Sequence, residues 1–100
     1  SKIPVVVQSS EGVVINYDIR VLTHAIVRNI KVVLAAAGAT LHDIVDIQVY
    51  LTNMKKDFKT FNEVYSTYFK DLGPTRTTIE VGSLPTPINV EFIVIARVGK

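Results

Sequence analysis

An arginine that follows a Gly-Pro corner is the residue best suited to bind an anion. The motif is GPTRTT at residues 73–78, and it places Arg76 where a predicted helix gives way to a predicted strand. The guanidinium offers five N–H donors in a rigid plane that fits a carboxylate through two parallel hydrogen bonds, and Pro74 restricts the backbone upstream of it. Arg76 could instead tie its loop to a carboxylate such as Glu80, and the sequence leaves both interpretations open.

A glutamate in the last predicted strand is the second candidate for chemistry. Glu91 shares one strand face with Ile93, Ile95 and Arg97, whereas the alternate residues face the other way. A carboxylate among apolar side chains must be paired, or its pKa is raised by desolvation. A structural ion pair with a nearby arginine or lysine and a catalytic role are therefore both open for Glu91.

Other chemistries lack the residues that they need. The chain has no cysteine, which excludes disulfides, thiolate catalysis and cysteine-based metal sites. His24 and His42 do not stand at metal-ligand spacing, no serine lies in a nucleophile elbow, and there is no glycine-rich phosphate loop. Nothing in the sequence therefore favours hydrolysis through a Ser–His pair, a metal site or nucleotide binding.

Length and composition predict one soluble domain over residues 1–100. A chain of this size buries about 60–65% of the surface that its unfolded form exposes, which is enough for a single core. The net charge of +2 is spread along the chain and disfavours nucleic acid as a partner. No apolar run reaches the about 18 residues of a membrane helix, and the start lacks a signal-peptide pattern. We expect a cytoplasmic protein that does not enter a membrane.

Hydrophobic periodicity divides the chain into strands and helices. The predicted strands are Ile3–Val7, Val13–Ile15, Ile44–Leu51, Thr77–Val81 and Val90–Val98. The first helix follows Asp18 as its N-cap and ends before Gly38, and the second runs from Asp57 to Leu72. Turns are expected at Gln8–Gly12, at a capping-box-like Thr40–Asp43 and at the proline-stiffened Gly82–Pro87. The first two runs could also be one strand and a loop.

The order of these elements predicts a two-layer α+β sandwich in which both helices cover one face of a sheet. We expect each strand to pair with its neighbour in the chain, so that the last two strands lie side by side. Most aromatic residues lie at helical spacing on the second helix, which favours core packing over a stacking platform for nucleic-acid bases.

The last strand is apolar on both faces, which predicts an interface. If the helices cover Val90, Phe92 and Val94, then Ile93 and Ile95 would face water in a monomer. The mean hydropathy of +0.32 is high for so short a chain. We therefore predict that the second sheet face packs against another subunit.

Several motifs in order resemble a known family. They are Asn29–Lys31, Ala36–Leu41, Asp43–Val45, Asn62–Tyr65, GPTRTT at 73–78, and Leu84-Pro85 followed by Val90-Glu91. From Asp18 nearly to the C-terminus, the chain resembles the RidA/YjgF family of reactive-intermediate deaminases, which act on enamines and imines. Its GPTRTT and LPTP motifs are most similar to the 2-aminomuconate deaminase branch.

The resemblance implies a homotrimer of chorismate-mutase-like α+β subunits, each with two helices on a mixed β-sheet and with active sites in the clefts between subunits. It implies that Glu91 is catalytic and positions a water, that Arg76 binds the substrate carboxylate, and that Thr77 and Asn62 belong to the substrate-binding site. The family hydrolyses enamines and imines, such as 2-aminoacrylate, to a keto acid and ammonia without metal or organic cofactor.

Full-length members of that family begin with an additional β-hairpin that contributes pocket-lining groups. We expect this chain to lack it, since Ser1–Pro4 resembles the end of the hairpin. Two other functions stay open. One is a non-catalytic trimeric ligand-binding or protein-interaction module. The other is a translation-inhibiting ribonuclease, which the modest charge and the absence of a catalytic histidine pair disfavour.

Overall fold

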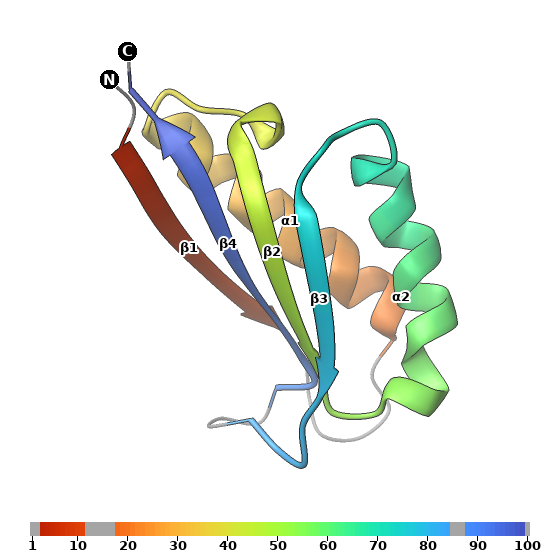
Figure 1. Ribbon diagram of the computed structural model, residues 1–100. Coiled ribbons are helices and arrows are strands. Elements are labelled where there is room, and N and C mark those ends of the chain that lie inside the picture. Colours follow the sequence, from red (N-terminus) through yellow and green to blue (C-terminus); the bar gives the residue numbers. More distant parts are fainter. Residues whose placement is uncertain (1–2, 12–17, 85–87, 100) are drawn as a thin grey trace.

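A computed structural model of the 100-residue chain describes residues 3–11, 18–84 and 88–99. Its strands are β1 (Ile3–Glu11), β2 (Ile44–Leu51), β3 (Thr75–Glu80) and β4 (Val90–Val98). The helices are α1 (Ile19–Ala36) and α2 (Met54–Phe69), and a 3₁₀ turn, η1, covers Leu41–Asp43. Both helices lie on the same side of a single four-stranded sheet, and the other side of the sheet is open (Figure 1). The predicted two-layer α+β sandwich is confirmed.

The strand order is β1-β4-β2-β3, which makes the sheet mixed. β4 is antiparallel to both β1 and β2, and β2 is parallel to β3 through the crossover that contains α2. The expectation that the last two strands are neighbours is wrong. β4 carries apolar residues on both faces and therefore suits a central position, whereas the polar β3 suits the edge of a sheet.

The ends of three elements differ from the expected ones. β1 continues through the expected turn as far as Glu11, because every residue from Ile3 to Glu11 pairs with β4. α2 begins at Met54 rather than Asp57, since the Asn53 Oδ1 accepts a hydrogen bond from the Lys56 N–H at 3.1 Å and caps the helix earlier. α2 ends at Phe69, and β3 covers Thr75–Glu80 rather than 77–81. The expected strand Val13–Ile15 lies outside the described residues.

The caps of α1 follow the prediction. The Asp18 Oδ1 accepts a hydrogen bond from the Arg20 N–H at 3.0 Å, and Gly38 follows the helix with a φ of 77°. The capping box at Thr40 and Asp43 is also confirmed, because the Thr40 N–H donates to the Asp43 carboxylate at 2.8 Å. These local bonds set where α1 ends and where β2 begins.

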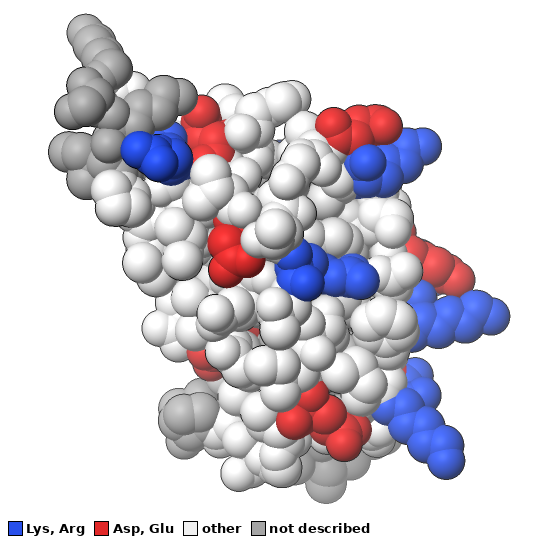
Figure 2. Space-filling model, viewed as in Figure 1, with Lys and Arg blue, Asp and Glu red and all other residues white. Residues whose placement is uncertain are grey.

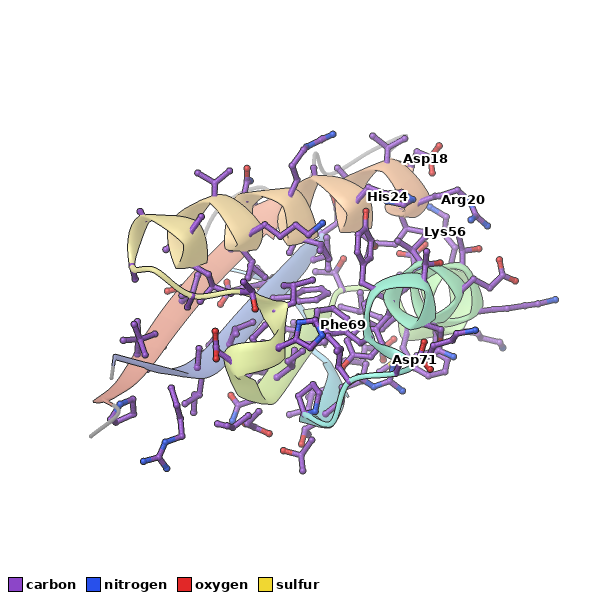
Figure 3. All side chains as sticks on the ribbon, turned by 90° about the horizontal axis from the view of Figure 1, so that it is seen from above. Asp18, Arg20, His24, Lys56, Phe69 and Asp71 are labelled. Atoms are coloured by element: carbon purple, nitrogen blue, oxygen red, sulfur yellow. The ribbon has the colours of Figure 1, made fainter. Side chains whose placement is uncertain are left out.

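The core lies between the helices and the sheet, and Figure 3 shows side chains filling this layer. β4 contributes Val90, Phe92, Val94 and Ala96, all fully buried. The aromatic residues of α2 pack against them, and the Phe61 and Phe92 rings are 5.8 Å apart in an edge-on arrangement. Core packing of the aromatic residues is therefore confirmed. Neither described helix is both long and apolar enough to cross a membrane.

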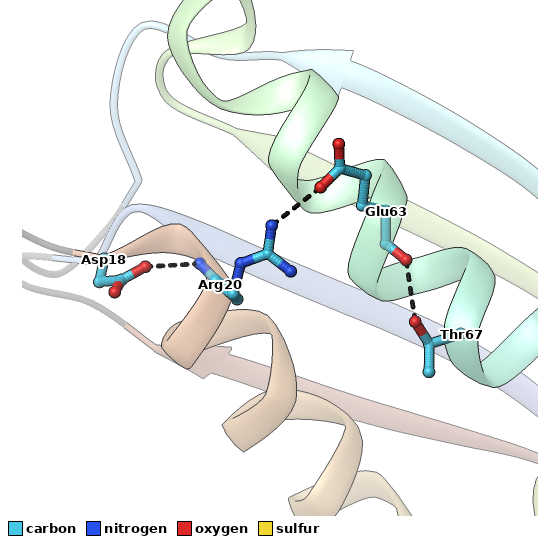
Figure 4. Close-up of polar contacts among 4 residues, drawn as sticks. All are labelled: Asp18, Arg20, Glu63 and Thr67. Atoms are coloured by element: carbon cyan, nitrogen blue, oxygen red, sulfur yellow. Dashed lines mark hydrogen bonds and ion pairs between the residues drawn. The ribbon is translucent and has the colours of Figure 1, made fainter.

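Polar contacts join α1 to α2 at the outer surface of the helix layer. The Arg20 Nη2 lies 2.8 Å from the Glu63 Oε2, and Figure 4 shows this ion pair beside the Asp18 cap. One turn further along α1, the His24 Nδ1 lies 2.6 Å from the Tyr68 hydroxyl. Figure 3 shows Arg20 and His24 on the side of α1 that is turned towards α2. His24 thus has a structural partner.

Candidate functional site

Arg76 lies on β3 with its side chain on the helix face of the sheet. It pairs with Ile47 of β2, which is fully buried beneath the helices. The Arg76 Nη1 donates a hydrogen bond to the Asn62 Oδ1 of α2 at 2.6 Å. Its guanidinium carbon lies 4.6 Å from the centre of the Tyr65 ring, within the range of a cation–π interaction. Arg76 therefore bridges the edge strand and α2.

The guanidinium of Arg76 is held without a carboxylate partner among the residues that the structure describes. The Glu80 carboxylate, the alternative partner, accepts a hydrogen bond from the Met54 N–H at 2.8 Å and helps to start α2. Arg76 is only half-buried, so its remaining N–H donors are within reach of a ligand. A guanidinium of this kind has the hydrogen-bond donors and the charge that are needed to bind an anion.

Tyr65 stays neutral beside this cation. Burial raises the pKa of the Tyr65 hydroxyl above its ordinary value of 10.0, the Arg76 charge acts in the opposite direction, and the Asp46 carboxylate adds to the increase. The loss of hydration outweighs the attraction of the guanidinium, because burial is the largest of the three contributions. Near neutral pH, Tyr65 thus presents an uncharged aromatic ring to Arg76.

Glu91 lies on the open face of the sheet. It pairs with Tyr50 of β2, and only 8% of its surface is exposed. The Glu91 Oε1 accepts a hydrogen bond from the Gln8 Nε2 of β1 at 3.0 Å. Within the described ranges, no arginine or lysine forms an ion pair with it. The hydrogen bond from Gln8 leaves lone pairs of the carboxylate for a further donor such as water.

The strand register arranges the open face in rows that cross the sheet. One row contains Gln8, Ile93, Gln48 and Thr77, and the next contains Glu91 beside Tyr50. The Tyr50 hydroxyl donates to the Gln48 Oε1 at 2.8 Å. Figure 2, viewed from this side, shows a surface that is mostly uncharged, with charged side chains in a few places and along its right-hand edge. This face resembles an interface more than a solvated surface.

The structure brings together two of the four residues that the sequence assigned to the site. Arg76 and Asn62 are in contact, whereas Glu91 and Thr77 lie on the opposite face of the sheet. Thr78, which the sequence did not assign to the site, shares the face of Arg76, and its Oγ1 is buried without a hydrogen-bond partner among the described residues. The alternation of side chains along a strand could have identified Thr78, because residues i and i+2 point the same way.

Comparisons with known proteins agree with the fold and its motifs. The family model described as endoribonuclease L-PSP matches residues 3–98. A RutC family protein of Saccharolobus solfataricus is 45% identical over 96 residues, which cover 96% of this chain and 74% of the relative. TdcF of Escherichia coli, which carries the provisional name of reactive intermediate deaminase, is 34% identical over 98 residues, covering 95% of this chain and 73% of TdcF.

Solved structures show the same architecture. A Mycobacterium tuberculosis member of the YjgF/YER057c/UK114 family has a TM-score of 0.84 at 30% identity, covering 95% of this chain and 79% of that one. The Escherichia coli TdcF structure with bound serine has a TM-score of 0.75 at 32% identity, covering 86% of this chain and 68% of TdcF.

The chain spans between 66% and 74% of the length of the first two curated relatives. No comparison singles out the 2-aminomuconate branch, which stays a prediction. The assignment of the chain to the family does not depend on the branch, because the family model matches nearly the whole chain. The chain belongs to the endoribonuclease L-PSP family, which is the RidA/YjgF family that its sequence motifs predicted.

Proposed function

We propose that this protein is a deaminase that hydrolyses reactive enamines and imines bearing a carboxylate, of the 2-aminoacrylate or 2-aminomuconate type. The observation that carries the proposal is the guanidinium of Arg76, which is fixed by Asn62 and Tyr65 and has no described carboxylate partner. The relative TdcF supports it, because one TdcF structure contains bound serine, which has a carboxylate.

In this proposal Arg76 binds the substrate carboxylate through two charge-assisted hydrogen bonds, each worth about 1.5–3 kcal/mol. The Asn62 Oδ1 occupies one N–H of the guanidinium and limits its rotation. The side-chain amide of Asn62 retains N–H donors for the same ligand. Binding through the carboxylate places the C=N carbon at a fixed distance from Arg76, where a water can attack it.

Glu91 acts on that water. An enamine first becomes the imine by gaining a proton on carbon and losing one from nitrogen. The water oxygen then bonds to the imine carbon while Glu91 takes one proton from the water and delivers it to the imine nitrogen, which gives a carbinolamine. Glu91 next takes the proton of the carbinolamine hydroxyl and transfers it to the amine nitrogen as the C–N bond breaks, which releases ammonia, leaves a keto acid and returns Glu91 to its starting form. General acid–base catalysis of this kind contributes about 10²- to 10⁴-fold.

The site of this reaction lies between two copies of the chain in a homotrimer. Arg76 and Glu91 are on opposite faces of one sheet, so neither can reach a small substrate held by the other within one chain. The open face, with Ile93 and Ile95 beside Glu91, is the surface on which a second copy packs. The reaction uses these protein groups without a metal or organic cofactor.

The direct test generates 2-aminoacrylate with a serine dehydratase and follows pyruvate formation with and without this protein. We expect faster pyruvate formation with the wild-type chain and no acceleration with Arg76→Ala or Glu91→Gln. The control is Arg28→Ala, which removes an exposed arginine of α1 on the opposite side of the molecule from the open sheet face. Equal rates with and without the wild-type protein would refute catalysis of this reaction. Repeating the assay with 2-aminomuconate decides between the two substrate types.

A module that binds carboxylates without turnover is the second candidate function. The observation that favours it is the hydrogen bond from Gln8 to Glu91, which already occupies one oxygen of the proposed catalytic carboxylate. Gln8→Ala frees this oxygen. If pyruvate binds through Arg76 but neither the wild-type protein nor the Gln8→Ala variant accelerates the hydrolysis of 2-aminoacrylate, the protein is a binding module and not a deaminase.

A further inference from the structure

Among the described residues, three aromatic rings lie near the Arg76 guanidinium, and Tyr65 makes the shortest contact. The guanidinium carbon lies 4.6 Å from the centre of the Tyr65 ring, and 5.8 Å and 5.9 Å from those of Phe58 and Phe61. The last two distances are at the limit of about 6 Å for a cation–π interaction. Tyr65 is therefore the main aromatic partner of Arg76.

The Tyr65 ring is itself fixed by its neighbours. It stacks on Phe69 with ring centres 4.6 Å apart and an interplanar angle of 28°, and it contacts Phe61 at 5.7 Å. Only 8% of Tyr65 is exposed. A ring held on this many sides cannot turn to follow a mobile arginine, so the ring determines where the guanidinium lies.

Helical spacing directs Asn62 and Tyr65 to the same partner. The two residues are three positions apart on α2 and therefore share one side of the helix. Asn62 accepts a hydrogen bond from one guanidinium nitrogen, and Tyr65 contacts the face of the same group. A planar cation held at one face and at one nitrogen keeps its orientation, and its other N–H donors stay available.

The hydroxyl of Tyr65 has no hydrogen-bond partner among the described residues. Its ring, by contrast, contacts Arg76, Phe61, Phe69 and Phe92. The structure therefore assigns the contact with Arg76 to the aromatic face, and replacing the hydroxyl with hydrogen leaves that face in place. This separates the role of Tyr65 from acid–base chemistry.

We infer that Tyr65 is a positioning residue, whose aromatic face presets the guanidinium of Arg76 for binding a carboxylate. The inference rests on the proposed function only in taking Arg76 as the carboxylate site. It predicts that affinity for a carboxylate depends on the ring at position 65 and not on its hydroxyl. A preset guanidinium loses less rotational freedom on binding, which increases affinity.

The test measures pyruvate affinity by calorimetry in the assembled wild-type protein and in folded variants. Tyr65→Phe keeps the ring and should bind as the wild type does. Tyr65→Leu removes the ring and should raise the Kd about 2- to 30-fold, the range that cation–π contacts span. Tyr68→Leu is the matched control, because Tyr68 lies on α2 but contacts His24 and Lys31 instead of Arg76.

A spectroscopic measurement tests the same inference in the unaltered protein. A ring below the guanidinium shifts the Arg76 Nε–H proton resonance upfield, whereas the exposed Arg28 of α1 provides the unshifted reference. We expect the upfield shift in the wild type and in Tyr65→Phe, and its loss in Tyr65→Leu. An Arg76 resonance at the position of Arg28 in the wild type would overturn the inference even if Tyr65→Leu does not fold.

The inference and the proposed function can fail separately. An unchanged Kd in folded Tyr65→Leu, or an equal loss of affinity in Tyr65→Phe, overturns the role of the ring. Unchanged pyruvate affinity in Arg76→Ala also overturns it. If pyruvate binding depends on the ring but 2-aminoacrylate is not hydrolysed, the inference stands and the deaminase proposal fails. If both hold, Tyr65→Leu should raise KM with little change in kcat.

Discussion

Arg76 and Glu91 lie on opposite faces of one four-stranded sheet. Arg76 shares the helix face with Ile47, its partner on β2, whereas Glu91 shares the open face with Tyr50. The two side chains are thus separated by the backbone of the sheet. If both act on one substrate, each must belong to a different copy of the chain, and this requirement is open to a direct test.

Mixing two inactive variants should restore activity. Arg76→Ala retains Glu91 and Glu91→Gln retains Arg76, so a mixed assembly contains some sites with both residues intact. For random equimolar assembly, about a quarter of the shared sites are intact, and we expect about a quarter of the wild-type rate. The measurement is 2-aminoacrylate hydrolysis after the two variants are unfolded and refolded together.

The controls for this mixing experiment are each variant refolded alone and the double variant mixed with wild type. The single variants should stay inactive after refolding. A mixture that is no more active than its components, although mass spectrometry detects mixed assemblies, would show that Arg76 and Glu91 do not cooperate across an interface.

Local patterns in the sequence predicted which residues share a face but not which strands are neighbours. The alternation in β4 separates Glu91 from Phe92 correctly, because side-chain direction has a period of two. The position of β4 between β1 and β2 depends on contacts between residues that are distant in sequence, and so does the hydrogen bond between Arg76 and Asn62. No local sequence pattern predicts either of them. Alternation along β3 also shows that Thr78, and not Thr77, shares the face of Arg76, so this neighbour of Arg76 can be identified from the sequence.

The ion pair between Arg20 and Glu63 should contribute little to stability. Its two side chains are 51% and 52% exposed, so water weakens the attraction. A double-mutant cycle with Arg20→Ala and Glu63→Ala should give a coupling energy of about 0.2–1 kcal/mol in urea unfolding, decreasing as salt is added. The control cycle combines Glu63→Ala with Arg28→Ala, because Arg28 is an exposed arginine of α1 without a described ion pair. A salt-independent coupling above this range would contradict the expectation.

Gly38 should resist substitution, because it ends α1 in a left-handed conformation with a φ of 77°. The Ala39 N–H donates to the Leu34 carbonyl at 2.8 Å and the Gly38 N–H to the Ala35 carbonyl at 3.0 Å, which is a Schellman motif. A Cβ at Gly38 meets no atom within 4 Å, so the cost is backbone strain rather than a clash. Gly38→Ala should lower the free energy of unfolding by roughly 1–2 kcal/mol.

Gly73→Ala is the matched control for Gly38→Ala. A Cβ at Gly73 also meets no atom within 4 Å, and its φ does not lie in the positive range. The substitution should be neutral or stabilise the protein by up to about 1 kcal/mol, since it reduces the freedom of the unfolded chain. Equal losses of stability in both variants, measured by urea unfolding, would contradict the assignment of strain to Gly38.

The phenol of Tyr65 should make stability depend on pH in the alkaline range. Its pKa in the folded protein is raised above 10.0 by burial, the largest cause, and by Asp46 of β2, against the opposing effect of Arg76 of β3. The folded state therefore keeps this proton to higher pH than the unfolded state does. The contribution to stability is complete below the unfolded pKa, and it is lost as pH rises through the folded pKa.

Comparing the wild type with Tyr65→Phe isolates this contribution, because all other titrating groups are common to both. The difference in free energy of unfolding between the two proteins should be constant near neutral pH and should shift against the wild type above about pH 10. Urea unfolding at a series of pH values measures it. A difference for Tyr65→Phe that does not vary up to alkaline pH would contradict the role of burial.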